Sequence, residues 1–147
     1  MISIEVRDTP FQPYQVLDEF VRNHPELSAA CGATSVFIGT MRDFNEGVTV
    51  RAMWLEHYPG MTEMELQRIV QAAADSHGFH SALVIHRVGA LAPADAIVLV
   101  AVWSPHRRAA LEATAEIIET LKHRAPFWKK ETLEEGARWV QCNTAGR

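Results

Sequence analysis

A cluster of cations stands at the start of a predicted helix. Ser104 and Pro105 close an apolar run, and His106, Arg107 and Arg108 follow directly. Ser104 suits the N-cap and Pro105 the first helical position. The exposed N–H groups and positive dipole end of a helix start attract anions, whereas cations there are unfavourable unless an anion compensates them. We therefore expect an anion site, the alternative being that the three side chains extend into solvent.

All three lysines of the chain lie in the stretch KHRAPFWKK, from Lys122 to Lys130. Helical steps back from Lys122 give a mostly apolar stripe: Ile118, Ala115, Leu111 and Arg107. A partly buried lysine near other cations, here Arg124 and Lys129, should have a lowered pKa and can serve as a base or nucleophile near neutral pH. The alternative is a helix-terminal lysine that only complements the helix dipole.

The end of this stretch is predicted to be a strand. Strand alternation then places Lys129 on one face with Phe127 and Glu131, and Lys130 on the other face with Trp128. Periodicity leaves open which lysine points inward. The alternative interpretation is an edge strand that lysines protect against aggregation.

Other polar residues lie in or at the end of apolar strands. The run Phe37-Ile38-Gly39-Thr40-Met41-Arg42 ends in a lone arginine before a loop. A lone arginine is usually a surface residue, but ligand-binding residues also gather at strand ends. His57 and His86 lie within apolar strands, and we interpret them as satisfied histidines of the core or its rim.

The spacing of the histidines and cysteines does not predict a metal site or a reactive thiol. His77 and His80 lack the rigid helical spacing of a zinc pair, so no metal site is predicted. Cys31 and Cys142 are far apart, match no metal or redox spacing, and have no predicted basic neighbour that would activate a thiolate. No cofactor is predicted.

The chain reads as one α+β domain. Helices are predicted over 14–22, 61–77 and 105–123, and strands over 2–6, 34–40, 48–57, 82–88, 96–103, 127–132 and 137–141. Thr62 and Glu65 are read as a capping box at the start of the second helix, and residues 23–32 as a loop. The mixed order favours a mixed or antiparallel sheet with a C-terminal β-hairpin over a doubly wound parallel fold. The domain is expected to cover 1–147, with 1–32 as its N-terminal part and 142–147 as a tail.

Composition excludes several classes of function. The net charge is −4, which argues against nucleic-acid binding. The sequence has no apolar run of 18 residues, and its N-terminus lacks the pattern of a secretory signal, so neither a membrane span nor export is predicted. A reducing cytoplasmic location is the simplest expectation.

Five segments together resemble the catalytic, or large, subunit family of molybdopterin synthase. The resemblance extends from about Thr34 to Val140, and its most specific segments are FIGTMR (37–42), LEHYPGMT (55–62), IHRVG (85–89), SPHR (104–107) and KHRAPFWKKE (122–131). Five such segments in one order are improbable by chance. One departure is Pro105, where the family pattern leads us to expect a small residue; proline fits the first helical position, so the function is not in doubt.

The resemblance implies an activity and partners. Such an enzyme converts cyclic pyranopterin monophosphate into molybdopterin during molybdenum cofactor biosynthesis. Its sulfur arrives as a thiocarboxylate on the C-terminal Gly-Gly of a ubiquitin-like small subunit. The large subunit forms a homodimer within a heterotetramer, and its fold is of the α/β-hammerhead type.

The resemblance also implies site residues. Lys122 and Lys129 match the catalytic positions. The substrate-binding positions match Thr40, Met41, Arg42, His106, Arg107, Lys130 and Glu131. Two further residues, Phe37 and Arg138, are expected to line the pocket.

Two alternatives and one geometric conflict stay open. A phosphoesterase or phosphate-ester lyase using His106 would turn over without a protein partner, and a non-catalytic adaptor would bind a ubiquitin-like tail without chemistry. The conflict is that His106 and Lys122 lie on one predicted helix, about 24 Å apart at about 1.5 Å per residue. A twofold dimer in which each pocket takes residues from both protomers would remove this conflict.

Overall fold

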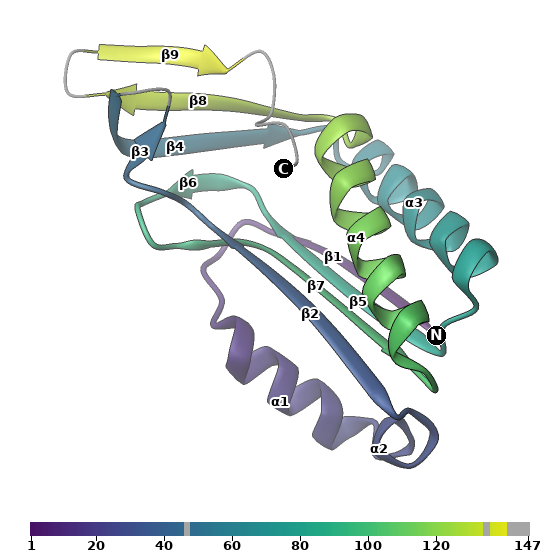
Figure 1. Cartoon of the computed structure of the whole chain (residues 1–147). Coiled ribbons are helices and arrows are strands. Elements are labelled where there is room, and N and C mark those ends of the chain that lie inside the picture. The colour runs from purple at the N-terminus through teal and green to yellow at the C-terminus, as the bar shows by residue number, and fades with distance from the viewer. Residues whose placement is uncertain (46–47, 134–135, 141–147) are drawn as a thin grey trace.

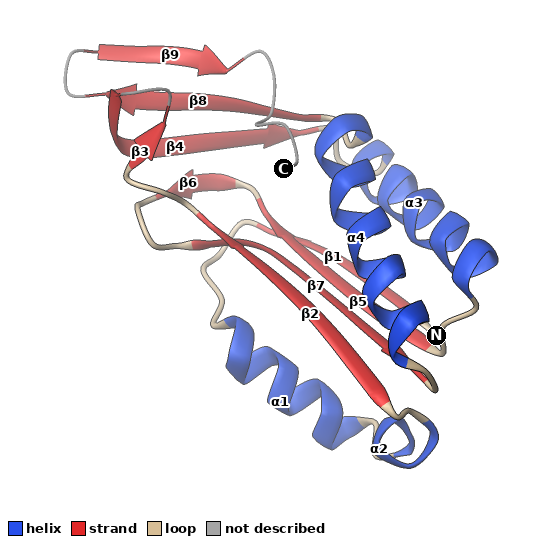
Figure 2. Cartoon of the chain, in the orientation of Figure 1, coloured by secondary structure: helices blue, strands red, loops and turns tan. Residues whose placement is uncertain are grey.

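The structure is a computed structural model that describes residues 1–45, 48–133 and 136–140. Figures 1 and 2 show the arrangement of its helices and strands. In chain order the elements are β1 (Ile2–Arg7), α1 (Pro13–Asn23), α2 (Glu26–Ala30), β2 (Ala33–Thr40), β3 (Phe44–Asn45), β4 (Val48–His57), α3 (Met61–His77), β5 (Ser81–Arg87), β6 (Gly89–Leu91), β7 (Ala96–Ser104), α4 (Arg107–Arg124), β8 (Phe127–Leu133) and β9 (Gly136–Val140).

The main sheet has the strand order β1-β5-β7-β2. β1 pairs in parallel with β5, and the β5–β7 and β7–β2 pairs are antiparallel. Helices α3 and α4 cover one face of this sheet, and α1 and α2 lie over the other (Figure 1). β2 is therefore an edge strand of the main sheet.

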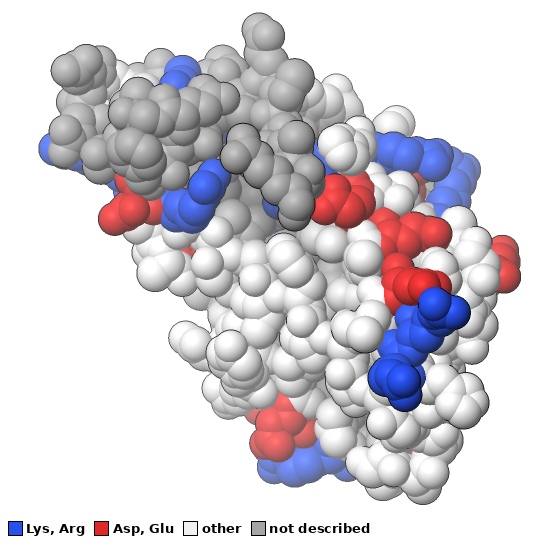
Figure 3. All heavy atoms as spheres, in the orientation of Figure 1, with Lys and Arg blue, Asp and Glu red and all other residues white. Residues whose placement is uncertain are grey.

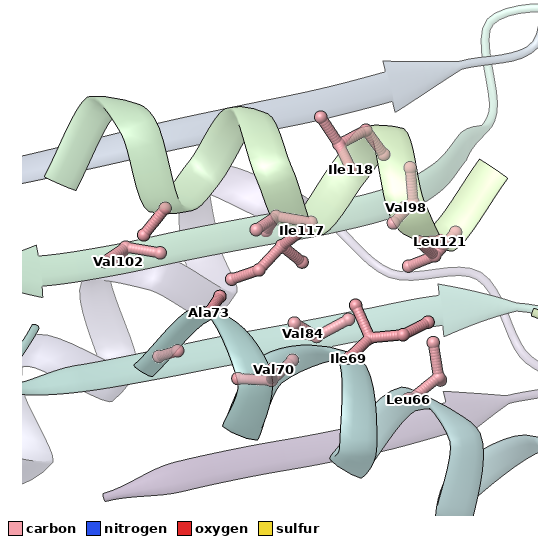
Figure 4. Close-up of a cluster of buried hydrophobic side chains, with 13 residues drawn as sticks. Leu66, Ile69, Val70, Ala73, Val84, Val98, Val102, Ile117, Ile118 and Leu121 are labelled. Carbon is pink, nitrogen blue, oxygen red and sulfur yellow. The ribbon is translucent and has the colours of Figure 1, made fainter. Parts of the chain in front are cut away.

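Strand alternation divides the hydrophobic core between the two faces of the main sheet. Val84 and Val98 are among the residues that face α3 and α4, where they meet Leu66, Ile69 and Ile117 (Figure 4). The other face, toward α1 and α2, carries Leu83, Ile85, Leu99, Ala101 and Trp103 of β5 and β7, which form the second cluster with Phe11 and Leu27. Because both faces are covered, β5 and β7 are buried along nearly their whole length.

A second sheet lies beside the C-terminal end of α4 (Figure 1). Its strand order is β3-β4-β8-β9, and β6 also pairs with β4. The β4–β8 and β8–β9 pairs are antiparallel. A third cluster of buried side chains packs between this sheet and the main one: Met41, Met53, Leu55, Val88, Leu91 and Ile97. These findings confirm the predicted α+β class, the mixed sheet and the C-terminal hairpin.

The start of α4 differs from the prediction. The sequence placed the N-cap at Ser104, but Ser104 is the last residue of β7, buried and paired with Ala33 of β2. Sheet pairing thus prevails over the local capping preference of a serine. His106 takes the N-cap position in an extended conformation, and the helix begins at Arg107.

Two smaller predictions were also wrong. The Thr62–Glu65 capping box does not form: the Glu63 carboxylate accepts the Gly60 N–H at 2.8 Å, while the Thr62 hydroxyl accepts the Tyr58 N–H at 3.1 Å. Residues 23–32, predicted as a loop, contain the short helix α2, which starts after Pro25. Proline's fixed φ favours a helix start, which explains this difference. No helix within the described residues has the length and apolar character needed to cross a membrane.

Candidate active site

Two lysines meet at the junction of α4 and β8. Lys122 lies in the last turn of α4, and Lys129 lies in β8 with its side chain half-buried. Burial lowers the pKa of Lys122. Burial is also the main cause that lowers the pKa of Lys129 to about 8, followed by the charge of Lys122; Arg42 adds to this, and the Glu131 carboxylate opposes it. At neutral pH, Lys129 thus has a much larger neutral fraction than an ordinary lysine.

The chain turns sharply between the two lysines. α4 ends at Arg124, because the extended backbone of Ala125 and the following Pro126 cannot continue the helix. The Pro126 carbonyl accepts the Thr62 hydroxyl at 3.3 Å, which ties the turn to the first turn of α3. Phe127 then begins β8. This short connection returns Lys129 to the same region as Lys122.

The structure settles which face of β8 points inward. Lys129 lies directly opposite the fully buried Leu55 of β4, and Glu131 lies opposite the buried Met53. Trp128, on the other face, is exposed. Lys129 is therefore the inward lysine of the pair that the sequence left open. The side chain of Lys130 lies outside the described part of the structure.

An ion pair with a buried carboxylate lies next to the lysines. Glu131 is only 4% exposed, and its carboxylate accepts the Arg138 Nε–H at 3.1 Å. The two residues lie directly opposite each other on β8 and β9. Both were predicted pocket residues, and the structure places Glu131 two positions from Lys129 on the same face of the strand. The negative charge of Glu131 thereby limits how far the pKa of Lys129 falls.

The end of β2 approaches the same region. Met41 is buried between the two sheets, where its N–H donates to Asp95 O at 2.9 Å and its carbonyl accepts the Ala94 N–H at 2.8 Å. These bonds fix the point from which the exposed Arg42 extends, and the Arg42 charge reaches Lys129. Thr40 is exposed at the strand end, whereas Phe37 packs against the core beneath α4.

His86 is buried next to the two lysines. Its ring is 3% exposed and stacks on Phe127, with 3.9 Å between the ring centroids. Burial is the main cause that lowers the pKa of His86 to about 3, and the charges of Lys122, Lys129 and His57 lower it further. The predicted role as a satisfied core histidine is confirmed, but its position below the lysine pair was missed. The one available signal was a histidine in the otherwise apolar run ALVI before it.

The predicted anion site lies at the far end of α4. His106, Arg107 and Arg108 are exposed, and with Gly32 and Leu111 they line a shallow depression. α4 is one continuous helix, so His106 and Lys122 are about 24 Å apart along its axis at about 1.5 Å per residue. One protomer therefore does not bring the cations at the helix start together with the lysine pair.

Other candidate groups have structural partners. The His77 Nε2 lies 3.2 Å from a Glu116 carboxylate oxygen, and His80 contacts the Ser81 hydroxyl. Among the described residues, no cluster of His, Cys, Asp and Glu could hold a metal ion. Burial raises the pKa of the Cys31 thiol, which disfavours a reactive thiolate. Cys142 lies outside the described residues.

Known proteins provide independent comparisons. Residues 6–124 match the family model described as MoaE protein. The chain is 49% identical over 142 residues to the molybdopterin synthase catalytic subunit of Ralstonia nicotianae, a match that covers 97% of this chain and 78% of that protein.

Two solved structures resemble the fold. The molybdopterin biosynthesis MoaE protein from Burkholderia ambifaria has a TM-score of 0.80 and 37% identity, with 99% of this chain and 93% of that chain covered. The protein–protein complex of subunits 1 and 2 of the molybdopterin-converting factor from Helicobacter pylori has a TM-score of 0.75, and 97% of this chain and 92% of that one are covered. Its 17% identity makes this a similarity of fold alone. The family match over most of the chain and the 49% identity to the Ralstonia protein place the chain in the MoaE protein family.

Proposed function

We propose that this chain is the catalytic subunit of a molybdopterin synthase, a sulfurtransferase of molybdenum cofactor biosynthesis. Its substrate would be cyclic pyranopterin monophosphate, and its sulfur would come from the C-terminal thiocarboxylate of a ubiquitin-like small subunit. The observation that carries this proposal is the half-buried pair Lys122 and Lys129, with the pKa of Lys129 lowered to about 8. We expect the reaction to take place in the cytoplasm, which cell fractionation can test.

The lysine pair suits the chemistry of sulfur transfer. Each transfer forms a carbon–sulfur bond on the pterin side chain and releases oxygen from the same carbon. Water must then cleave the bond between this sulfur and the acyl carbon of the tail, which leaves as a carboxylate. Protons must therefore move to the departing oxygen and from the attacking water. A lysine with a pKa near 8 can donate and accept protons at physiological pH. Lys122 and Arg42 add positive charge that attracts the thiocarboxylate anion. The sulfur is imported, so the chain needs no cysteine nucleophile of its own.

A protein partner is part of the proposal. The fold neighbour from Helicobacter pylori is a complex of two subunits of a molybdopterin-converting factor. For this chain, we propose that the small subunit's tail reaches the lysine pair. Thr40, Met41 and the Glu131–Arg138 ion pair would border the path that the tail takes. Lys130 remains a predicted contact.

A second copy of the chain is also part of the proposal, because the helix-start cations are remote from the lysines. β2 supports a particular arrangement: it is an edge strand without a charged residue, and the surface over most of it is uncharged (Figure 3). It begins beside the His106 end of α4 and ends two residues before Arg42. Its length is about 26 Å at about 3.3 Å per residue, close to the axial separation of His106 and Lys122.

Antiparallel pairing of β2 with its twofold mate would bring the two half-sites together. The His106 end of one protomer would then lie beside the Arg42 end of the other. Each pocket would hold the phosphate at the start of one α4 and the reacting carbons beside the lysines of the other protomer. Exposed edge strands are often paired or shielded in proteins, which favours such an interface.

One assay distinguishes the three candidate functions. The chain is incubated with cyclic pyranopterin monophosphate and a thiocarboxylated small subunit, and the dithiolene product is measured. Dithiolene formation that requires both the chain and the thiocarboxylate supports the proposal. Turnover of a phosphate ester without any partner would support a phosphoesterase or lyase, and tight partner binding without product would support an adaptor.

A further inference from the structure

His86 is a neutral ring at the base of a cationic site. It lies in β5, and its Nδ1 is 2.8 Å from the carbonyl oxygen of Arg87. Because a carbonyl only accepts, Nδ1 carries the proton and Nε2 keeps its lone pair. The imidazole is thus fixed in one tautomer and one orientation by the backbone of its own strand.

Basic side chains face this ring from three elements. Lys122 comes from α4, Lys129 from β8 and His57 from β4. With burial, these charges lower the pKa of His86 to about 3, against the opposing effect of the hydrogen bond with Arg87. His86 therefore stays neutral at physiological pH. It adds no further cation to the site, and it does not exchange protons with a substrate in that range.

The ring contacts the segment that joins the two lysines. Phe127, which stacks on His86 with 14° between the ring planes, is five residues after Lys122 and two before Lys129. It is the first residue of β8 and lies opposite His57. The stack therefore links the buried main sheet to the α4–β8 junction, and Lys129 follows on the same face of the strand as Phe127.

We propose that His86 is a positioning residue: its ring, held by the Arg87 carbonyl and stacked on Phe127, sets the separation of Lys122 and Lys129. Its part in catalysis rests on the proposed sulfur transfer, whereas its effect on the lysines does not. A ring is required to support Phe127. The hydrogen bond to Arg87 orients that ring and is of secondary importance.

Two variants separate the ring from the hydrogen bond. His86→Phe keeps a flat ring that can stack and loses the donor, whereas His86→Gln keeps a donor and loses the ring. Val84→Ala is the matched control, because Val84 is a buried residue on the same face of β5 that packs in the α3–α4 core. It lowers stability by removing buried methyl groups of this cluster while leaving the His86 side chain unaltered.

The first measurement is the pH dependence of Lys129 acylation, followed by peptide mass spectrometry after brief exposure to acetic anhydride. In the unmodified protein the midpoint should be about 8, as set by burial, Lys122, Arg42 and Glu131. His86→Gln lets the lysines separate and water enter, so the midpoint should rise by about one pH unit. His86→Phe and Val84→Ala should leave the midpoint within about 0.3 unit of its original value.

The second measurement is dithiolene formation. His86→Gln should lower kcat by at least about tenfold with KM changed less than about twofold, because misplaced lysines affect the chemical step. His86→Phe should retain most of kcat. The inference is overturned if His86→Gln keeps both the midpoint and kcat, or if His86→Phe shifts them as far as His86→Gln does. If the midpoints shift as expected but the unmodified protein makes no dithiolene, the proposed function fails and the positioning role stands.

Discussion

The sharpest prediction concerns the two ends of α4. We consider two variants of the chain, His106→Ala/Arg107→Ala and Lys122→Ala. The continuous helix Arg107–Arg124 keeps the altered positions about 24 Å apart within a protomer, at about 1.5 Å per residue. A pterin phosphate is too small to span this distance. Each variant alone is expected to be inactive, because each damages every pocket of its homodimer.

Mixing the variants should restore activity if pockets are shared between protomers. In a mixed dimer, one pocket combines the intact lysine of the first variant with the intact His106 and Arg107 of the second, and the other pocket is doubly damaged. Random subunit exchange makes about half of the dimers mixed, and one pocket in each is intact, so activity should return to about a quarter of that of the unmodified protein.

The assay is dithiolene formation after the two variants, carrying different affinity tags, have been mixed and allowed to exchange. Tandem purification through both tags isolates the mixed dimer, whose activity should be about half that of the unmodified dimer. Each variant exchanged with itself is the control. If mixed dimers are recovered and remain inactive, each pocket is built within one protomer and the shared-site reasoning is wrong.

The remaining predictions concern the chemistry of sulfur transfer. Lys122→Ala and Lys129→Ala should each lower dithiolene formation by at least ~10²-fold while the melting temperature changes little, because both are proton-transfer candidates outside the hydrophobic core; near-normal activity of both would remove their catalytic assignment. If neutral Lys129 is the active form, the rate should rise with pH through about 8. Glu131→Gln removes a charge that raises this pKa, so the rise in rate should shift to lower pH by roughly half a unit. Arg42→Ala removes a charge that lowers it, so the rise should shift to higher pH by roughly the same amount. Shifts of the two variants in the same direction would contradict the electrostatic account. Replacing both cysteines with serine should leave sulfur transfer intact, and its loss in a folded variant would show that a cysteine thiol takes part in the reaction.

Periodic segments were predictable from the sequence. The bounds of β4 and α3 agree with the prediction, because each has a clear repeat and α3 ends at a glycine in the left-handed conformation that favours this residue. These bounds depend on interactions between residues close in sequence, which a pattern can reveal. The stripe that singled out Lys122 was less accurate, because Ile118 is buried but Ala115 and Leu111 are exposed.

Features that depend on distant partners could not be predicted. Phe127 and Trp128 are both aromatic, so the sequence could not tell which face of β8 is buried. The position of Lys129 opposite the buried Leu55 of β4 decides it. The Glu131–Arg138 pair depends on the register of the β8–β9 hairpin. The position of His86 depends on contact between strands more than 40 residues apart in sequence, β5 and β8.

The continuity of α4 has a consequence for how a dimer with shared pockets would respond to ligand. One rigid helix would belong to two pockets, with its first turn binding phosphate in the neighbour's pocket and its last turn supplying Lys122 to its own. A phosphate that draws the first turn inward would displace the last turn along the same axis, because an α-helix resists stretching far more than it resists moving as a body. Occupancy of one pocket would then alter the lysine geometry of the other. Substrate binding should therefore be cooperative, with a Hill coefficient different from one. Replacing the exposed Ala115 and Glu119 of α4 with glycine, which makes the helix more flexible without changing its register, should weaken that cooperativity.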